Sequence, residues 1–185
     1  MSCADVSEIH TKLPADEESF EKGYAAESMF LKEALEPEGA IRLSPLGGVV
    51  ALAALFGRNL IHLHRPGSND DITNLNGDFW RRHRQQDNIL LNLVLSLPEH
   101  MRLPAGIEVP NVVFTNLSIH TSTICLHQAA IFKADSAKLS GNIAAESKIR
   151  CITAASEIAS IMRMASHREE NLVSQRMASP LNIVC

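Results

Sequence analysis

The stretch FWRRHRQQDNILLN, from Phe79 to Asn92, joins an aromatic pair to a basic head and an apolar second half. On a helix, spacings of three and four residues bring side chains to one face. The side chains that share such a face here are Phe79, His83, Gln86, Leu90, Leu93 and Leu97. Leu91 and Val94 lie beside this face, so the second half should be buried nearly all round. We therefore predict a core helix from Phe79 to about Leu97, where a proline ends it.

The basic head of this helix raises the question of nucleic-acid binding. Its charged residues are Arg81, Arg82 and Arg84, with Asp78 and Asp87 on either side. Asp78 can pair with Arg81, and Asp87 with Arg84, because each pair stands three residues apart. A surface for single strands needs a larger positive excess and aromatic rings that are free to stack, whereas Trp80 is expected to be buried. We therefore predict a packed helix with an internally paired head, not a nucleic-acid site.

The composition of the whole chain favours helices. Apolar residues make up 45% of the 185 residues and aromatic residues only 4%. A chain rich in Leu, Ala and Ile and poor in Tyr favours helical folds over a β-sandwich. Its length suits one domain, or a large part of one. The formal net charge of −4 does not attract the chain to phosphate backbones.

Start and stop signals extend the prediction to an all-α fold of about five helices. The predicted ranges are 16–35, 45–64, 79–97, 111–134 and 144–167. In the first, Phe20, Tyr24 and Leu31 are periodic, and Gly23 weakens the middle. The second begins at Pro45 and is apolar on nearly every face, which predicts deep burial.

The segments between the helices carry prolines with cations beside them. Residues 98–110 contain three prolines and a glycine, which predicts an ordered connector. Arg102 and Arg65 stand at or just before proline corners, where a guanidinium can bond loop carbonyls, so we interpret both as structural pins. The most apolar stretch, Gly47 to Phe56, is too short to span a bilayer, so no membrane partner is expected.

The four cysteines are Cys3, Cys125, Cys151 and Cys185, and no two form a CxxC pair. Scattered thiols predict a reduced, intracellular protein with Cys125 and Cys151 in the core. The first fifteen residues are largely polar, so no secretory signal is expected.

Two pairs of histidines are candidate sites. His120 and His127 share a helical face with Cys125 near them and could begin a zinc site, but no acidic partner lies near in sequence, so a hydrogen-bonded core histidine is preferred. His62 and His64 are expected at the surface or at a helix end. No nucleotide or nucleophile motif occurs, and a Cys/His enzyme remains a weak alternative. We therefore assign no catalytic, cofactor-binding or metal-ligating residue.

Several blocks, in order, carry a resemblance over residues 5–168. They are SEIHTKLPADEESFEKG, GRNLIHLHRP, GDFWRRHRQQDNILLN, LPEHMRLPAG, PNVVFTNLSIHTSTICLHQAAIFKAD and AAESKIRCITAASEIASIM. This set resembles the regulatory ("middle homology") domain of fungal zinc-cluster transcription factors, and is most similar to the xylanolytic transcriptional activator type. The resemblance implies a nuclear regulator of RNA polymerase II transcription, with carbohydrate-utilisation genes among the expected targets. Zinc and DNA contact would belong to a cysteine-rich region of the parent protein.

This chain departs from the family in two ways. Four scattered cysteines cannot supply the six thiolates of a two-zinc cluster, and the tail, residues 169–185, diverges from the expected apolar continuation. We therefore expect a fragment with a poorly ordered tail and an exposed apolar face that favours self-association. Expected partners are other parts of the parent factor or co-regulators. The alternative is a stand-alone helical module for an apolar small molecule.

Overall fold

The computed structural model describes residues 9–64, 71–139 and 141–178, with side chains as far as Arg168. The described part of the chain is all-α, as predicted, and it contains no β-strand beyond an isolated bridge between Lys12 and Phe30. The elements are α1 Glu17–Lys22, α2 Leu31–Ala34, α3 Pro37–Ala40, α4 Pro45–His64, α5 Asp78–Ser96, the 3-10 turn η2 Glu99–Met101, α6 Pro110–Ser136 and α7 Gly141–Ala178.

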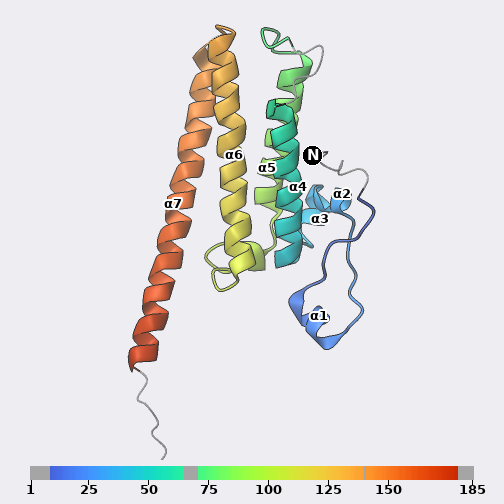
Figure 1. The fold of residues 1–185 in the computed structure, drawn as a ribbon, viewed down its shortest axis with the longest axis vertical. Helices are drawn as coiled ribbons and strands as arrows, with labels where there is room; N and C mark the ends of the chain where they lie inside the picture. Colours follow the sequence, from blue (N-terminus) through green and yellow to red (C-terminus); the bar gives the residue numbers. More distant parts are fainter. Residues whose placement is uncertain (1–8, 65–70, 140, 179–185) are drawn as a thin grey trace, which may run out of the picture.

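The four long helices run side by side and alternate in direction (Figure 1). Helix α6 is the central one, because it packs against α4, α5 and α7. The close contact of α4 with α6 depends on Gly48, where an added Cβ would come within 2.5 Å of Met101 Cε and 3.1 Å of Thr115 Oγ1. The largest apolar cluster lies between these helices and α2–α3, and includes Leu52, Leu90 and Leu126.

Local signals account for where these helices start and stop. Pro45 begins α4, and Ser44 Oγ caps it by accepting the Gly47 N–H at 3.0 Å. At the end of α5, Arg102 donates from Nε to the Leu97 carbonyl at 2.7 Å and from Nη2 to the Leu95 carbonyl at 2.9 Å. Arg102 is therefore the structural pin that was predicted, whereas Arg65 lies outside the described residues.

The predicted helix over residues 16–35 is wrong. It is split into α1 and α2, because Gly23 adopts a φ of +67° and ends α1. A stretch without helix follows, and the Met29 carbonyl near its end accepts the N–H of Leu13, which lies before α1, at 2.8 Å. Phe20 and Tyr24, which were placed on a periodic face, are 80% and 67% exposed.

Burial of α4 and α5 was overestimated. Only one face of α4 is buried, and Leu60 and Ile61 on its other side are exposed. In α5 the predicted face is buried at most of its positions, but Leu91 and Val94 are exposed. Both helices have partners on one side only, so their second apolar side remains at the surface.

By length and composition, α4 is the one helix of the described residues that could cross a bilayer, so the sequence-based statement that its apolar stretch is too short was too strict. One such helix is weak evidence, because a core helix passes the same test. In α4 the buried positions include the polar Asn59 and His62, and polar side chains are costly inside a membrane span.

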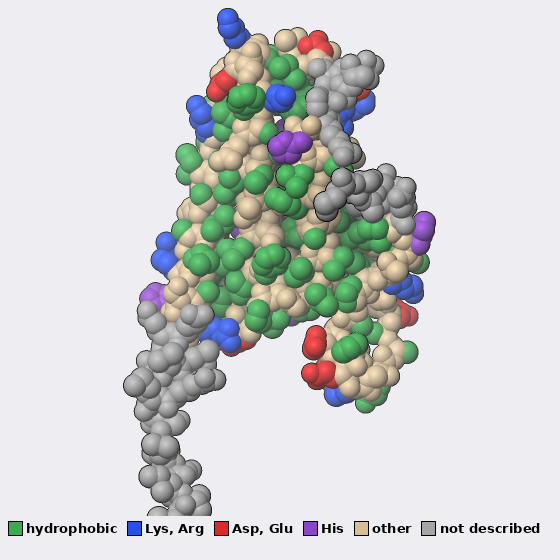
Figure 2. Space-filling view, viewed as in Figure 1, with side chains coloured by type: hydrophobic (Ala, Val, Ile, Leu, Met, Phe, Trp, Pro, Cys, Tyr) green, Lys and Arg blue, Asp and Glu red, His purple; other side chains and the backbone are tan. Residues whose placement is uncertain are grey.

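Large apolar side chains remain exposed on α6 and α7, among them Phe132, Ile149 and Ile152. Hydrophobic side chains are accordingly spread across the visible face of the long helices (Figure 2). Helix α7 continues to Ala178, beyond the predicted end near His167. The poor order of the tail and the self-association of the whole chain stay predictions, and residues 179–185 lie outside the described residues.

Candidate functional site

A row of buried aromatic and imidazole rings joins the end of α4, the start of α5 and the second half of α6. His62 of α4 stacks on Phe79 of α5, with ring centroids 4.7 Å apart, and Phe79 meets Trp80 edge-on at 5.1 Å. His83 stands 5.8 Å from Trp80 and 5.4 Å from His127 of α6. The Trp80 indole N–H donates to the Ile72 carbonyl at 2.9 Å, which satisfies its polar atom.

His62 and His64 both lie in the last turn of α4, as the helix-end alternative predicted. His62 is buried there, so a surface position is wrong for it, while His64 is exposed. Alternation in HLH places one imidazole on the inner side of α4 and the next on the outer side. The spacing of HLH predicts that the two imidazoles face different ways, because residues two apart on a helix do so, but it does not decide which of them faces the core.

An ionic network continues this row into α7. Arg150 of α7 donates from Nη2 to Asp87 Oδ1 at 2.6 Å, and Nε2 of His127 lies 3.2 Å from the same oxygen. The other ring nitrogen of His127 lies 3.3 Å from Ser147 Oγ. His127 is thus the hydrogen-bonded core histidine that was predicted, in preference to a zinc ligand.

One of the two ion pairs predicted for the first half of α5 is present, and the other is not. Arg81 does pair with Asp78, at 2.8 Å. Arg84 does not pair with Asp87 but donates to the Leu75 carbonyl at 3.0 Å. Asp87 points inward because Arg150, 63 positions later, supplies a cation at a half-buried position.

Burial and charge set the protonation states of this network. Burial, with repulsion from His127 and His62, lowers the pKa of His83 to about 4, so its ring is neutral near neutral pH. Burial opposes ionisation of Asp87, but hydrogen bonds from His127 and Arg150 outweigh it and hold the pKa of Asp87 at about 2. The network therefore holds a carboxylate and a guanidinium as a half-buried pair.

Ser147, His127 and Asp87 lie in the order of a hydrolase triad, which requires a catalytic interpretation to be weighed. A nucleophile must reach a substrate, yet Ser147 and His127 are each only 4% exposed. Ser147 also lines none of the cavities described below. Arg150 engages the aspartate directly, which gives the group a structural explanation as a link between three helices.

The remaining candidates do not come together as a site. Cys125 and Cys151 are half-buried rather than in the core, and Cys151 Sγ lies 3.8 Å from the Ile124 carbonyl oxygen. Burial raises the pKa of the Cys151 thiol, which reduces its thiolate fraction. Among the residues that the structure describes, no three His, Cys, Asp or Glu side chains are placed to hold a metal ion. Zinc content remains to be measured.

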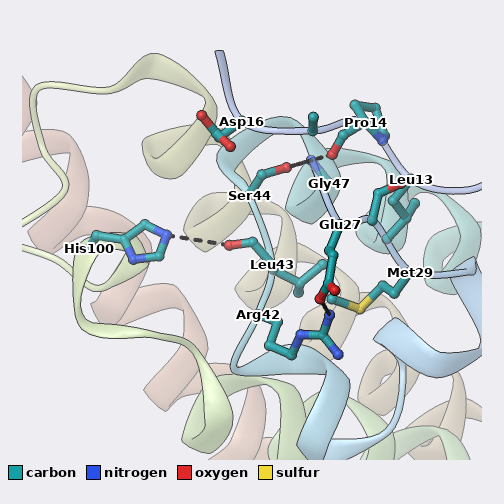
Figure 3. Close-up of a pocket in the computed structure, with 12 residues that line it drawn as sticks. Leu13, Pro14, Asp16, Glu27, Met29, Arg42, Leu43, Ser44, Gly47 and His100 are labelled. Atoms are coloured by element: carbon teal, nitrogen blue, oxygen red, sulfur yellow. Dashed lines mark hydrogen bonds and ion pairs between the residues drawn. The ribbon is translucent and has the colours of Figure 1, made fainter. Parts of the chain in front are cut away.

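One cavity of about 180 Å³ lies beside the start of α4 (Figure 3). Its polar groups already have partners: Ser44 Oγ donates to the Pro14 carbonyl at 3.0 Å, and His100 Nε2 lies 3.3 Å from the Leu43 carbonyl. Arg42 and Glu27 form an exposed ion pair at 3.8 Å. These contacts join Pro14 and Glu27 of the N-terminal segment to the residues just before the start of α4, so the cavity lies at the junction of the two.

A second, more open cavity of about 330 Å³ lies between α5, α6 and α7. Leu95, Leu97 and Ile161 form its apolar wall, and His120 and Glu157 its polar edge. Burial lowers the pKa of His120, which favours the neutral imidazole there. His120 and His127 thus lie in different surroundings.

Comparison with curated proteins shows what this helical chain is similar to. It is 27% identical over 158 residues to the citrinin biosynthesis transcriptional activator mrl3 of Monascus ruber, a match that covers 84% of this chain and 30% of the relative. The activator ctnR of Monascus purpureus is also 27% identical, with 27% of its length covered. The transcription factor tazR of Aspergillus terreus is 25% identical over 121 residues, 64% of this chain.

The chain is thus similar over most of its length to fungal transcriptional activators, which are transcription factors and not enzymes. It spans less than a third of the length of these relatives. No protein-family model matches the chain, and no solved structure does. The similarity agrees with the predicted resemblance at the level of a fungal transcription-factor regulatory segment.

Proposed function

We propose that this chain is a regulatory segment of a fungal transcription factor, of the xylanolytic-activator type of middle homology domain. It acts in the nucleus on RNA polymerase II transcription through contacts with protein, not through DNA. The observation that carries the proposal is the similarity to three fungal transcriptional activators along most of an all-α chain. The α5 head adds support, because Trp80 is buried and therefore not free to stack on bases, and Asp78 offsets part of the positive charge by pairing with Arg81.

The target genes form a finer part of this proposal. Two relatives are named as activators of citrinin biosynthesis. Their names favour genes for the biosynthesis of a small molecule over the carbohydrate-utilisation genes expected from the sequence. Neither class follows from the residues of this chain.

A reporter experiment tests the regulatory role. The whole chain is fused to a heterologous DNA-binding domain in a fungal host, and transcription from a matching promoter is measured. We expect output to differ severalfold from that of the DNA-binding domain alone, and the difference to be lost with Phe79→Ala, which disrupts the core. Unchanged output with a well-expressed fusion would contradict the proposal. The unfused chain should show no sequence-specific shift of DNA at physiological salt.

The cavity between α5, α6 and α7 supports the second candidate, a module that binds an apolar small molecule. Its volume lies at the low end of the roughly 300–1,000 Å³ typical of ligand sites. If this candidate holds, Ile161→Arg should abolish ligand-induced thermal stabilisation in a screen of apolar compounds. If no compound raises the melting temperature of the chain, the small-molecule candidate is contradicted.

A further inference from the structure

The loop formed by residues 14–29 stands away from the long helices and carries α1 at its far end (Figure 1). None of the six residues of α1 is buried. Its ends are nevertheless capped: Asp16 accepts from the Ser19 N–H at 2.9 Å, and the Gly23 N–H bonds the Phe20 carbonyl. A helix this short gains little stability from its own hydrogen bonds in water. Its caps hold it in helical form, and its side chains face the solvent.

Two of the presented side chains are aromatic. Phe20 is 80% exposed and Tyr24 67% exposed. Buried aromatic rings dominate the energy of protein interfaces, and a pair on one projecting loop is a candidate anchor.

The charge of the chain is concentrated on the same loop. Five of the 21 acidic residues and one of the 17 basic residues lie in residues 14–29, so the other residues carry sixteen of each. The whole formal net charge of −4 therefore belongs to this loop. Figure 2 shows acidic side chains beside hydrophobic ones on the lobe at the lower right. A partner surface should combine an apolar floor with guanidinium or ammonium groups.

The structure contains a groove of this chemistry between α2–α3 and α5. It encloses about 460 Å³, and its apolar residues are Leu35, Pro37 and Ile89. Arg81 and Arg84 lie along it. Both are exposed. The Arg81 pair with Asp78 is an exposed i,i+3 contact that contributes little free energy, and the bond from Arg84 Nη1 to the Leu75 carbonyl uses one of the five N–H donors of that guanidinium. Glu36 also lines the groove, so its positive character comes from the α5 side.

We propose that the loop of one chain docks in this groove on a second copy of the same chain. Phe20 and Tyr24 occupy the apolar floor, and Glu17 and Glu21 face Arg81 and Arg84. In a two-fold dimer each copy gives a loop and receives one, so a single kind of contact is made twice. The inference stands apart from the proposed function, since it rests only on the loop, the groove and their charges.

The expected strength is modest. Each aromatic ring buries at most about 150–250 Å², so two loops place the contact among small interfaces, below about 1,200 Å² in total, which are typical of transient association. Its ionic part should be weakened by salt. We therefore expect a dimer at micromolar concentrations that dissociates on dilution or in high salt.

Sedimentation velocity of the full chain over a concentration series tests this contact. The loop variant is Glu17→Lys with Glu21→Lys, which spares Glu18 and its ion pair with Lys22. The groove variant is Arg81→Glu with Arg84→Glu. Each alone should associate at least about tenfold more weakly than the parent, the loss of a hot-spot contact. The matched control, Glu99→Lys with Glu146→Lys, makes the charge change of the loop variant on exposed sites elsewhere and should associate at least as well as the parent.

A mixture of the loop variant and the groove variant is the decisive test. The reversed loop of one now matches the reversed groove of the other, and the native loop and native groove match as well. The mixture should therefore recover association to within about threefold of the parent chain. A third variant, Phe20→Ser with Tyr24→Ser, should abolish the dimer while circular dichroism remains unchanged, because neither ring is buried.

Three results would overturn the proposal. The parent chain could remain a monomer at every concentration, or the variants could associate as tightly as the parent. The second result would place self-association on the exposed side chains of α6 and α7 instead. Failure of the mixture to associate, with both variants folded, would show that the loop and groove do not meet.

Discussion

Phe20 and Phe79 stand near the starts of two helices whose first turns are acidic, yet one is 80% exposed and the other 2%. Helix α5 continues for five turns and lies against α4 and α6, so Phe79 is covered by His62, Trp80 and the Lys133 side chain. Helix α1 ends after six residues at Gly23, before any facing element covers Phe20. An aromatic residue near a helix start therefore predicts burial only when the helix is long enough to pack against others.

The largest expected effect on stability is that of a substitution at Phe79, the buried ring of this comparison. Phe79→Ala removes a ring that contacts His62, Trp80 and Lys133, and leaves a cavity beside polar rings. We expect the free energy of unfolding to fall by about 3–5 kcal/mol. Urea denaturation followed by circular dichroism measures this, and a loss below about 1 kcal/mol would contradict the packing described.

The acid sensitivity of His83 comes next. Its pKa is lowered to about 4 in the folded chain, against about 6.5 when unfolded, because burial and the neighbouring His127 and His62 disfavour the cation. The unfolded chain therefore binds the proton first, so stability is complete above pH 6.5 and is lost as the pH falls towards 4. The loss is roughly 3 kcal/mol if the full shift holds.

Denaturation midpoints between pH 7 and 4 measure this loss. His83→Leu should flatten the curve in that window, whereas His64→Leu, at an exposed position, should leave its shape unchanged. A parent curve that is already flat would show that His83 is not held neutral by its surroundings.

A smaller effect is expected where α7 is joined to α5. Arg150→Met leaves the Asp87 carboxylate without its 2.6 Å donor at a half-buried site, which should cost about 1–3 kcal/mol. Arg81→Met breaks an exposed pair with Asp78 and should cost at most about 1 kcal/mol. A double-mutant cycle with Asp87→Asn should show coupling for Arg150, and equal costs for both arginines would refute the distinction.

The smallest effect on stability belongs to the exposed side of the comparison. At a dilution where the chain is a monomer, Phe20→Ala should change the free energy of unfolding by no more than about 0.5 kcal/mol, because the ring is exposed to water in the folded monomer and in the unfolded chain alike. The same denaturation measurement as for Phe79→Ala is used. A cost near that of Phe79→Ala would mean that α1 is packed in the protein.

Much of the fold could be predicted because its signals are local. The boundaries of α5 and α6 fall within one or two residues of the prediction, since prolines at positions 98 and 110 limit both helices. The failed helix at 16–35 has a local cause as well: Gly23 was noted, but a glycine inside a periodic pattern can either weaken a helix or end it. Periodicity alone could not decide between these outcomes.

The candidate site could be predicted only in part. His127 was expected to be a hydrogen-bonded core residue, and it is. The roles of Arg150 and Ser147 were not predicted, although an arginine inside the largely apolar run KIRCITAA is a signal for a buried acid on a facing helix. No residue near Asp87 in the sequence indicates a partner 63 positions away. Arg84, which is nearer, was therefore predicted as its partner.

The sequence by itself determined the all-α class, the extent of α4, α5 and α6 and the pin at Arg102, because these depend on contacts within a few residues along the chain. Only the tertiary structure decided that His62 is buried, that Asp87 pairs with Arg150 and that Phe20 and Tyr24 are left in water. Those outcomes depend on which helix faces which, and that is settled by the packing of segments far apart in the chain, above all α6 against its three neighbours.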